Sequence, residues 1–380
     1  MFLAWRDMLF ARTRFLLMGL VLALMSILIV IISGLTAGLV NDGVSGLKAM
    51  GEEGAEVIAF EDGTQTDSAF TRSIVPVTAA DDLAAADGID DATPMGLSIV
   101  NARNQDGTPV DLTLIGVDPD SFIAPEGMPA LAERTPGEPT PTAREIILSS
   151  HLADEGIEVG DIITLDRLET ELEVTAFADG QRTFGHVDMG YVPLDIWQEA
   201  HAGARAGEPA PDHAYEEASV IVGAGTPAEG VIVGGLDVRT LEESFQSSPG
   251  YGPEMMTLSM IEWFLYIITA LVTGAFFLVW TIQRSGDIAI MRAMGATRGF
   301  LLRDSLGQAV VILALSIAVG VALAVGLGLW LESSPMPYVT EFGRIFAGAG
   351  MLFVSGLIGA LVAVFRVTRT DPLTALGENR

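Results

Sequence analysis

The run FLLMGLVLALMSILIVIISGLTAGLVN, residues 15–41, decides the fold, because it carries no charged side chain across 27 residues. A bilayer core about 30 Å thick is crossed by roughly 20 helical residues. Three further charge-free runs, each of at least 21 residues, cover residues 263–283, 305–331 and 345–365. A helix satisfies its own backbone hydrogen bonds in lipid, so the four runs predict four membrane-spanning helices. The alternative for any single run is a buried core helix.

The N-terminal segment resembles a secretory signal, since arginines precede the first apolar run. Signal cores are about 7–15 residues long, so the longer run is predicted to stay as a permanent anchor. Within residues 1–14, the side chains of Phe2, Trp5 and Leu9 share one helical face. This segment is predicted either to lie as a short helix in the inner membrane interface or simply to continue the first helix.

Charge is distributed unevenly along the chain, whose net charge is −29. Residues 42–254 hold 41 acidic and 9 basic side chains, whereas most of the basic residues elsewhere form three groups beside the predicted spans. By the positive-inside rule those basic groups face the cytoplasm, and the acidic segment faces outward. The three cytoplasmic groups are Arg6, Arg12 and Arg14; Arg284, Arg292, Arg298 and Arg303; and Arg366, Arg369 and Arg380.

These signals predict a membrane α-helical protein with an α+β extracytoplasmic domain inserted between helices one and two. Its expected order is an interfacial helix (1–14), helix one (15–40), the acidic domain (41–255), helix two (256–283), a cytoplasmic loop (284–304), helix three (305–331), an outer loop (332–344), helix four (345–365) and a cytoplasmic tail (366–380). We expect a plasma-membrane protein with both termini in the cytoplasm.

The acidic domain shows mixed strand and helix patterns. Strands are predicted at residues 56–60, 112–117, 161–165, 172–177, 187–192 and 219–222, helices at 80–86, 149–155, 194–204 and 238–247, and a surface loop at 125–141. In the last two predicted spans, small residues recur every fourth position, which favours a helix-packing face over a substrate path. They are Ser316, Gly320, Ala324 and Gly328, then Ser355, Gly359 and Ala363.

Several chemistries are disfavoured by what the sequence lacks. It has no cysteine, no phosphate-binding loop of the G-x-x-x-x-G-K-[ST] type, and a single lysine, Lys48, so any ATP would be hydrolysed by another chain. The charge-free runs offer no ionisable group for ion coupling. A strongly acidic surface disfavours nucleic acid. The histidines lack metal-ligand or catalytic spacing, and structural or surface roles are predicted for them: His151, His186, His201 and His213.

The cytoplasmic loop carries the segment Gln283-Arg-Ser-Gly-Asp-Ile-Ala-Ile-Met-Arg-Ala-Met-Gly-Ala-Thr-Arg298. Ile288, Met291 and Met294 would share one face of a short helix ending at Gly295, which could dock in a groove of a partner protein. An ordinary basic juxtamembrane loop is the alternative. The residues expected to take part in docking are Arg284, Asp287, Ile288, Met291, Arg292, Gly295 and Arg298.

That segment resembles the signature of the MacB/FtsX-type ABC transporter permeases, with Asp287 where glutamate is more usual. The C-terminal motif containing Pro372, Ala375 and Leu376 is also similar, as are residues 147–154 followed by Val159-Gly-Asp161. The resemblance implies a homodimeric permease without its own ATPase site, which works with a separate cytoplasmic ABC ATPase. It further implies that residues 287–298 form the coupling helix and that ATP hydrolysis moves the outer domain mechanically.

The cargo is less constrained by sequence. The short outer domain and residues 183–197 resemble heme-exporting members of the family, so heme is expected as a transported substrate and no cofactor as permanently bound. Methionine thioether, tyrosine and carboxylate oxygen can ligate heme iron, against the alternative that these side chains only pack. The candidate residues are Met25, Met256, Met260, Glu262 and Tyr266. Export of another hydrophobic compound, a lipid or a peptide, and activation of a cell-wall hydrolase, remain alternatives.

Overall fold

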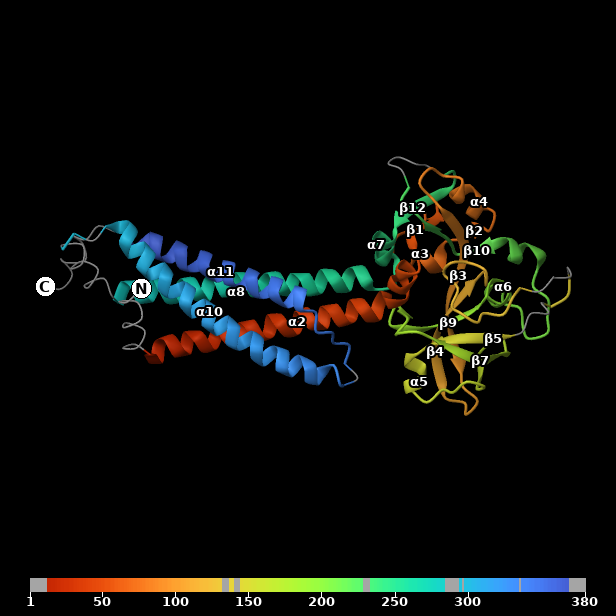
Figure 1. The fold of residues 1–380 in the computed structure, drawn as a ribbon, viewed down its shortest axis with the longest axis horizontal. Coiled ribbons are helices and arrows are strands. Elements are labelled where there is room, and N and C mark those ends of the chain that lie inside the picture. Colours follow the sequence, from red (N-terminus) through yellow and green to blue (C-terminus); the bar gives the residue numbers. More distant parts are fainter. Residues whose placement is uncertain are drawn as a thin grey trace. The chain divides into compact units, whose positions relative to one another are not determined.

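The computed structural model describes residues 12–131, 137–139, 144–227, 233–283, 294–295, 297–334 and 336–368. The chain divides into two compact units: residues 1–38 with 255–380, and residues 39–254 (Figure 1). The first unit is helical. The second holds all the described strands and short helices, so each unit is described by itself.

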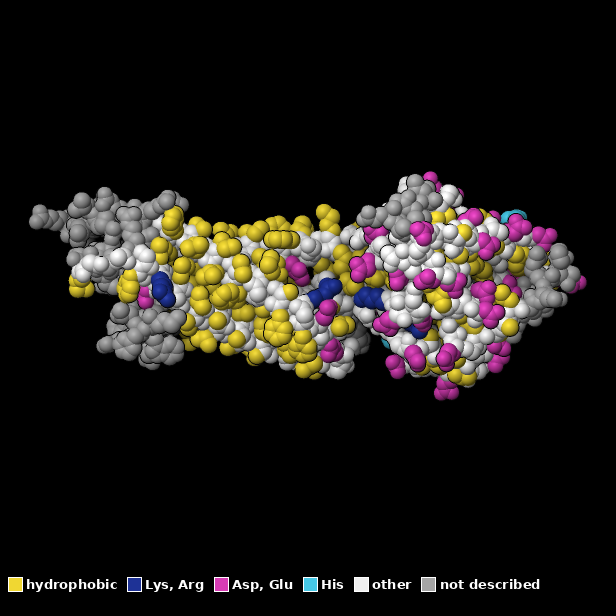
Figure 2. All heavy atoms as spheres, turned by 45° about the horizontal axis from the view of Figure 1, so that its top comes forward, with side chains coloured by type: hydrophobic (Ala, Val, Ile, Leu, Met, Phe, Trp, Pro, Cys, Tyr) yellow, Lys and Arg dark blue, Asp and Glu magenta, His cyan; other side chains and the backbone are white. Residues whose placement is uncertain are grey.

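Among the described residues, four helices are long and apolar enough to cross a membrane. They are α2 (Arg12–Glu52), α8 (Tyr251–Gln283), α10 (Arg298–Leu331) and α11 (Phe342–Thr368). Their shared core includes Leu22, Ile29, Phe277 and Leu313, which are fully buried. Hydrophobic side chains cover the outside of this unit, whereas carboxylates are spread over the outer domain (Figure 2). The prediction of four spans with an acidic domain between the first two is confirmed.

The helices extend beyond the ends that charge had indicated. Helix α2 continues twelve residues past the predicted end at residue 40, and α10 begins at Arg298, inside the predicted loop 284–304. Likewise α8 begins five residues early, at Tyr251, and α11 begins at Phe342, inside the predicted loop 332–344. The physical reason is that charge marks where lipid ends, whereas a helix continues in water if it gains other contacts. The predicted interfacial helix and C-terminal tail lie largely outside the described residues.

Small residues in the helical unit are packing contacts, as predicted. A Cβ atom added to Gly320 would lie 2.5 Å from the carbonyl oxygen of Ala23 on α2. One added to Gly359 would lie 2.0 Å from the carbonyl oxygen of Ala270 on α8. Helices α10 and α11 therefore approach α2 and α8 backbone to backbone at these points.

The outer domain is built on a sheet in the order β12-β1-β11-β3-β4-β9-β5-β7-β6, with β8 paired to β9. Strand β3 (Asp91–Arg103) pairs with β4, β11 and also β6, so the path from β3 through β4, β9, β5, β7 and β6 returns to β3. The other strands are β1 (Ala55–Glu61), β4 (Pro109–Val117), β5 (Glu145–Ser149), β6 (Ile162–Leu165), β7 (Thr170–Ala178), β8 (Thr183–Phe184), β9 (Val187–Pro193), β11 (Val220–Ala224) and β12 (Leu236–Thr240), with a separate pair β2 (Val75–Pro76) and β10 (Glu217–Ala218).

Short helices accompany this sheet: α3 (Ala69–Arg72), α4 (Ala79–Ala84), α5 (His151–Asp154), α6 (Leu194–His201) and α7 (Leu241–Ser244), with 3-10 turns η1 (Asp212–Glu216) and η2 (Phe245–Ser247). The six predicted strands are confirmed. The predicted helix at 238–247 is wrong in its first part, because residues 238–240 pair with β1 as part of β12. Strands β3 and β5 were missed altogether.

Candidate functional site

The outer half of α8 brings together two of the predicted substrate residues. Glu262 and Tyr266 lie about one helical turn apart on α8 and therefore share one face of the helix. Glu262 also interacts with the Ser33 hydroxyl of α2 and with the charge of Arg344 on α11. Carboxylates within a spanning helix are costly and often functional. This cluster therefore holds the candidate site.

Aromatic and methionine side chains continue the same region of α8. The rings of Trp263 and Tyr266 meet edge to face at 6.0 Å. Met256 is 76% exposed and Met260 is 51% exposed, so neither thioether is committed to the protein core. The surface of α8 here presents apolar side chains together with oxygen and sulfur atoms.

Met25 stands apart from the other four predicted residues. It lies eight residues before Ser33 on α2, about 12 Å along the helix at 1.5 Å per residue. Its side chain packs against the helical core. The structure thus places Met25 away from the Glu262 carboxylate, and supports a packing role for it.

The predicted docking segment falls largely outside the described residues, which include neither Arg284, Asp287 and Ile288 nor Met291 and Arg292. Gly295 is described and has a φ of 98°, a conformation that suits glycine at the end of a helix. Thr297 then caps α10 by accepting a hydrogen bond from the Phe300 amide at 3.3 Å. Arg298 is the first residue of α10.

A buried polar contact, which the sequence did not reveal, joins the two helices that flank this segment. The Trp280 indole of α8 donates to the Gln308 side chain of α10 at 3.3 Å. Gln308 is fully buried and in turn donates to Asp304 at 3.3 Å. Its one signal in the sequence was a glutamine inside an apolar run. The contact ties the inner ends of α8 and α10 together.

The outer end of α2 is held by a second set of contacts within the outer domain. The helix is interrupted at Val44, whose φ of −146° and ψ of 20° are not helical. The carbonyl oxygen of Gly43 accepts from the Gly185 amide at 2.9 Å and from the Ser248 hydroxyl at 3.1 Å. The hydroxyl of Thr183 donates to the Asp42 carbonyl at 2.6 Å. Carbonyls released by the break are thus satisfied by the domain.

Two of the histidines in the outer domain have structural contacts. His151 lies 3.1 Å from Asp188, and this hydrogen bond raises the pKa of the His151 imidazole. His201 stacks on Trp197 at 4.7 Å, and burial lowers its pKa. Among the described residues, no group of three histidine or carboxylate side chains is arranged for a metal ion.

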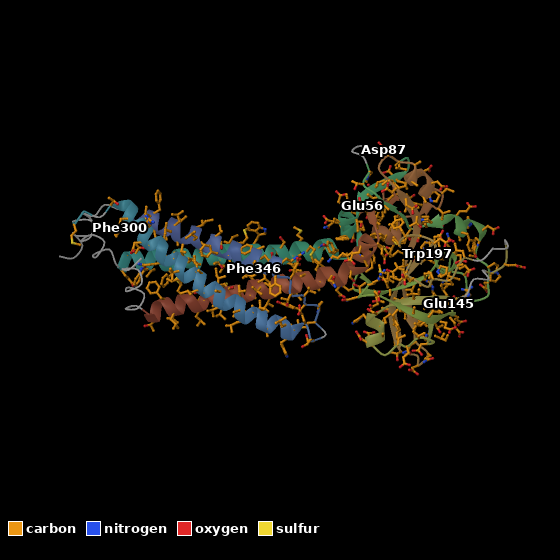
Figure 3. All side chains as sticks on the ribbon, viewed as in Figure 1. Glu56, Asp87, Glu145, Trp197, Phe300 and Phe346 are labelled. Atoms are coloured by element: carbon orange, nitrogen blue, oxygen red, sulfur yellow. The ribbon has the colours of Figure 1, made fainter. Side chains whose placement is uncertain are left out.

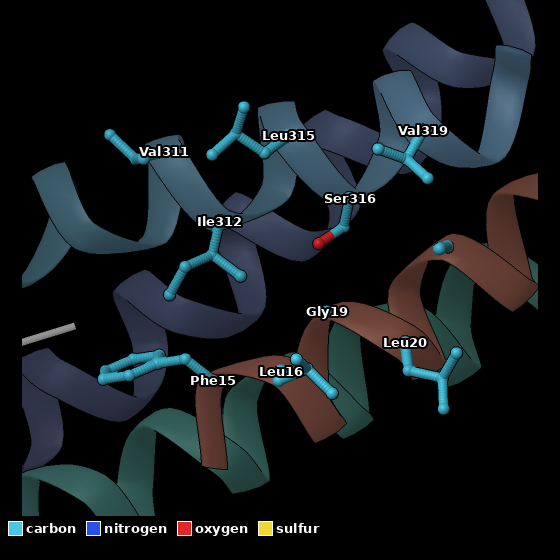
Figure 4. Close-up of a pocket in the computed structure, with 10 residues that line it drawn as sticks. Phe15, Leu16, Gly19, Leu20, Val311, Ile312, Leu315, Ser316 and Val319 are labelled. Carbon is cyan, nitrogen blue, oxygen red and sulfur yellow. The ribbon is translucent and has the colours of Figure 1, made fainter. Parts of the chain in front are cut away.

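Two apolar grooves flank the inner half of α2. One, of about 550 Å³, lies between α2 and α10, and its lining includes Gly19 and Ser316 (Figure 4). The other, of about 440 Å³, lies between α2 and α8 and includes Phe276 and Trp280. Their lining is almost wholly apolar, as expected for surfaces that face lipid or another helix.

Four helices long and apolar enough to span a membrane, with one α/β domain between the first and second, are typical of a membrane permease. The chain belongs to the MacB/FtsX-type permeases of ABC transporters. Residues 15–228 match the MacB-like periplasmic core domain, and residues 259–372 match the FtsX-like permease C-terminal domain. The predicted family is confirmed, and the inserted domain is therefore extracellular.

Two curated relatives have the same name, "Putative hemin transport system permease protein HrtB". That of Staphylococcus haemolyticus is 25% identical over 382 residues, covering 99% of each chain. That of Staphylococcus epidermidis is 29% identical over 143 residues, covering 38% of this chain and 41% of the relative. Among solved structures, the extracellular domain of the ABC-type transporter YknZ from Gram-positive bacteria is 14% identical, covers 46% of this chain and 85% of that chain, and has a TM-score of 0.30.

Proposed function

We propose that this permease exports heme, or another flat hydrophobic compound, using ATP hydrolysed by a separate cytoplasmic ABC ATPase. The observation that carries the proposal is the Glu262–Tyr266 pair on α8, with exposed Met256 and Met260 on the same helix. The name of the full-length relative supports the same cargo.

The side chains at the outer half of α8 could bind different parts of such a cargo. Glu262 and Tyr266 offer oxygen atoms, and Met260 offers a thioether, all of which are known types of iron ligand. The porphyrin plane would lie against exposed apolar side chains, among which Phe264 and Ile267 are 56% and 52% exposed. Arg344, which also pairs with Glu341 at 2.8 Å, offers a guanidinium that could bind the propionate groups of heme.

Transport itself is proposed to be mechanical. Helix α2 carries residues of both units, and next to its interruption at Val44 it is hydrogen-bonded to the domain through Asp42 and Gly43. Movement of α2 by the ATPase would therefore be passed to the outer domain. We propose that two permeases and two ATPases assemble, that both permease termini are cytoplasmic, and that residues 287–298 contact the ATPase.

The proposed cargo is tested by the ATPase rate of the permease with its ATPase in nanodiscs, measured against heme concentration. Heme should stimulate the rate saturably. The double change Glu262→Gln and Met260→Ala should raise the half-saturating heme concentration at least about tenfold, which corresponds to 1.4 kcal/mol of lost binding. Met351, which is 45% exposed on α11, provides the control: Met351→Ala should leave the heme response unchanged.

A normal basal rate with no response to heme would overturn the heme proposal and keep the permease assignment. The same preparation then separates the alternatives. Stimulation by a lipid or peptide would indicate export or extraction of that class. A response only to an extracellular cell-wall hydrolase would indicate that the permease transmits force without carrying cargo.

A further inference from the structure

The turn between β8 and β9 places a histidine in an unusual backbone conformation. Gly185 and His186 have φ values of 59° and 65°, so both central residues of this two-residue hairpin turn are left-handed. Such turns favour glycine, which has no Cβ, and asparagine, whose short polar side chain can hydrogen-bond locally. A non-glycine residue kept in this conformation is a reason to ask what its side chain does.

The His186 imidazole bridges the outer ends of two long helices. Its Nδ1 lies 2.8 Å from the Asp42 carboxylate on α2, and its Nε2 lies 3.2 Å from the Glu254 carboxylate on α8. The three side chains are 36%, 27% and 28% exposed, so the contacts are partly shielded from water. All three residues belong to the outer-domain unit.

The chemistry of this bridge depends on a proton. An ionised carboxylate only accepts hydrogen bonds, and a neutral imidazole carries one N–H. Both contacts can therefore be hydrogen bonds only when the imidazole is protonated on both nitrogens. Imidazole changes charge between about pH 5 and 8. A doubly protonated His186 donates to both carboxylates, whereas a neutral His186 leaves one carboxylate facing a ring lone pair.

Asp42 and Glu254 are the carboxylates that contact His186, and the other charged groups of its hairpin have partners of their own. On its own hairpin, Arg182 pairs with Glu53 at 2.8 Å, and Asp188 lies 3.1 Å from His151. On α2, Asp42 also accepts a hydrogen bond from the Gln181 amide at 3.1 Å. The carboxylates that respond to the protonation of His186 are thus Asp42 and Glu254.

We propose that His186 is a proton-dependent clasp that fastens the start of α8 to α2 and the outer domain. The two arms are unequal. The Asp42 arm is shorter, and α2 remains held there by Thr183, Gly185 and Ser248 when the imidazole is neutral. The Glu254 arm is the one released on deprotonation, which frees the first turn of α8. Given the proposed export function, an acidic exterior would then restrain the movement of the second span.

Hydrogen–deuterium exchange of the full-length permease in nanodiscs tests the clasp without ATPase or cargo. Peptides over residues 245–260 are compared at about pH 5.5 and pH 8, on either side of the imidazole titration, after correction for intrinsic exchange. Wild type should lose protection about fivefold at the higher pH, the scale of one partly exposed charged hydrogen bond. His186→Asn, which keeps a turn-forming residue, should show the low protection at both pH values.

Glu254→Gln separates a proton-dependent clasp from a merely structural contact. Its carboxamide can donate to neutral Nε2, so protection should stay high at both pH values. His151→Asn removes a histidine–carboxylate contact elsewhere in the domain and should keep the wild-type difference in protection between the two pH values. The proposal would be overturned if wild type showed no such difference in protection, or if His186→Asn still showed one. Either result leaves the heme response of the ATPase untouched, so the two proposals fail separately.

Discussion

Replacing Trp197 with alanine should lower the free energy of unfolding of the outer domain by about 3–5 kcal/mol, the range for large buried aromatic side chains. Trp197 lies on α6 and is only 2% exposed (Figure 3). Its ring covers two glycines of the sheet: a Cβ on Gly96 would lie 2.0 Å from the ring, and one on Gly116 would lie 2.3 Å from the Trp197 Cβ. The substitution therefore opens a cavity against rigid strands.

A partly buried hydrogen bond adds to the loss. The Trp197 indole donates to the Ser98 hydroxyl at 3.0 Å, and alanine leaves that hydroxyl without this donor. Pulse proteolysis of the full-length protein in urea measures the effect, since the outer domain is the part that urea exposes to protease. Val159, 61% exposed, provides the control, and Val159→Ala should change stability by less than about 0.5 kcal/mol. A loss below about 1 kcal/mol for Trp197→Ala would mean that the sheet closes over the cavity.

The spanning helices could be predicted because lipid imposes one simple requirement, a charge-free run of sufficient length. Their ends could not be predicted in the same way. The extension of α2 past residue 40 buries Val44, Leu47 and Met50 completely within the outer domain. Those contacts come from residues far along the chain, so charge near residue 42 marked the edge of the lipid and not the end of the helix.

The missed strands show a different limit. Strand β3 contains Pro94, Gly96 and Asn101, which have low strand propensity, and it forms because β4, β11 and β6 all pair with it. Strand β5 (Glu145–Ser149) is five residues long and directly precedes a helix, so its pattern is too short to distinguish from that helix, and its pairing with β7 and β9 defines it. Long-range pairing decided both elements, and one sequence does not display it.

The candidate site could be predicted only in part, because some of its residues come from other helices. The four-residue spacing of Glu262 and Tyr266 placed them on one face of a helix, which the sequence shows directly. Ser33 and Arg344 reach the same carboxylate from other helices, and no spacing rule could have included them. Met25 was predicted as a ligand only because it lies in the middle of the first span, and a position in a span does not indicate which residues lie near it.

Gly359→Val should abolish most of the correctly folded permease, with an overpacking cost of at least about 3 kcal/mol. The position is unusually tight, since an added Cβ would lie 2.0 Å from the Ala270 carbonyl oxygen, which is backbone and cannot rotate away. Gly274 of α8 faces Gly359, and a Cβ added to Gly274 would lie 3.1 Å from the Gly359 carbonyl oxygen. Helices α8 and α11 would have to separate, and their shared buried core would open.

Gly350→Val is the matched control, because Gly350 lies on the same helix and an added Cβ there has no atom within 4 Å. Both changes carry the same β-branched side chain and the same cost in helix propensity, so the difference between them isolates the helix crossing. The measurement is the yield of monodisperse protein after extraction, together with its thermal stability. Near wild-type values are expected for Gly350→Val. Equal values for the two variants would contradict a close approach of α8 and α11, and Gly359→Ala should fall between them, since alanine adds only the clashing Cβ.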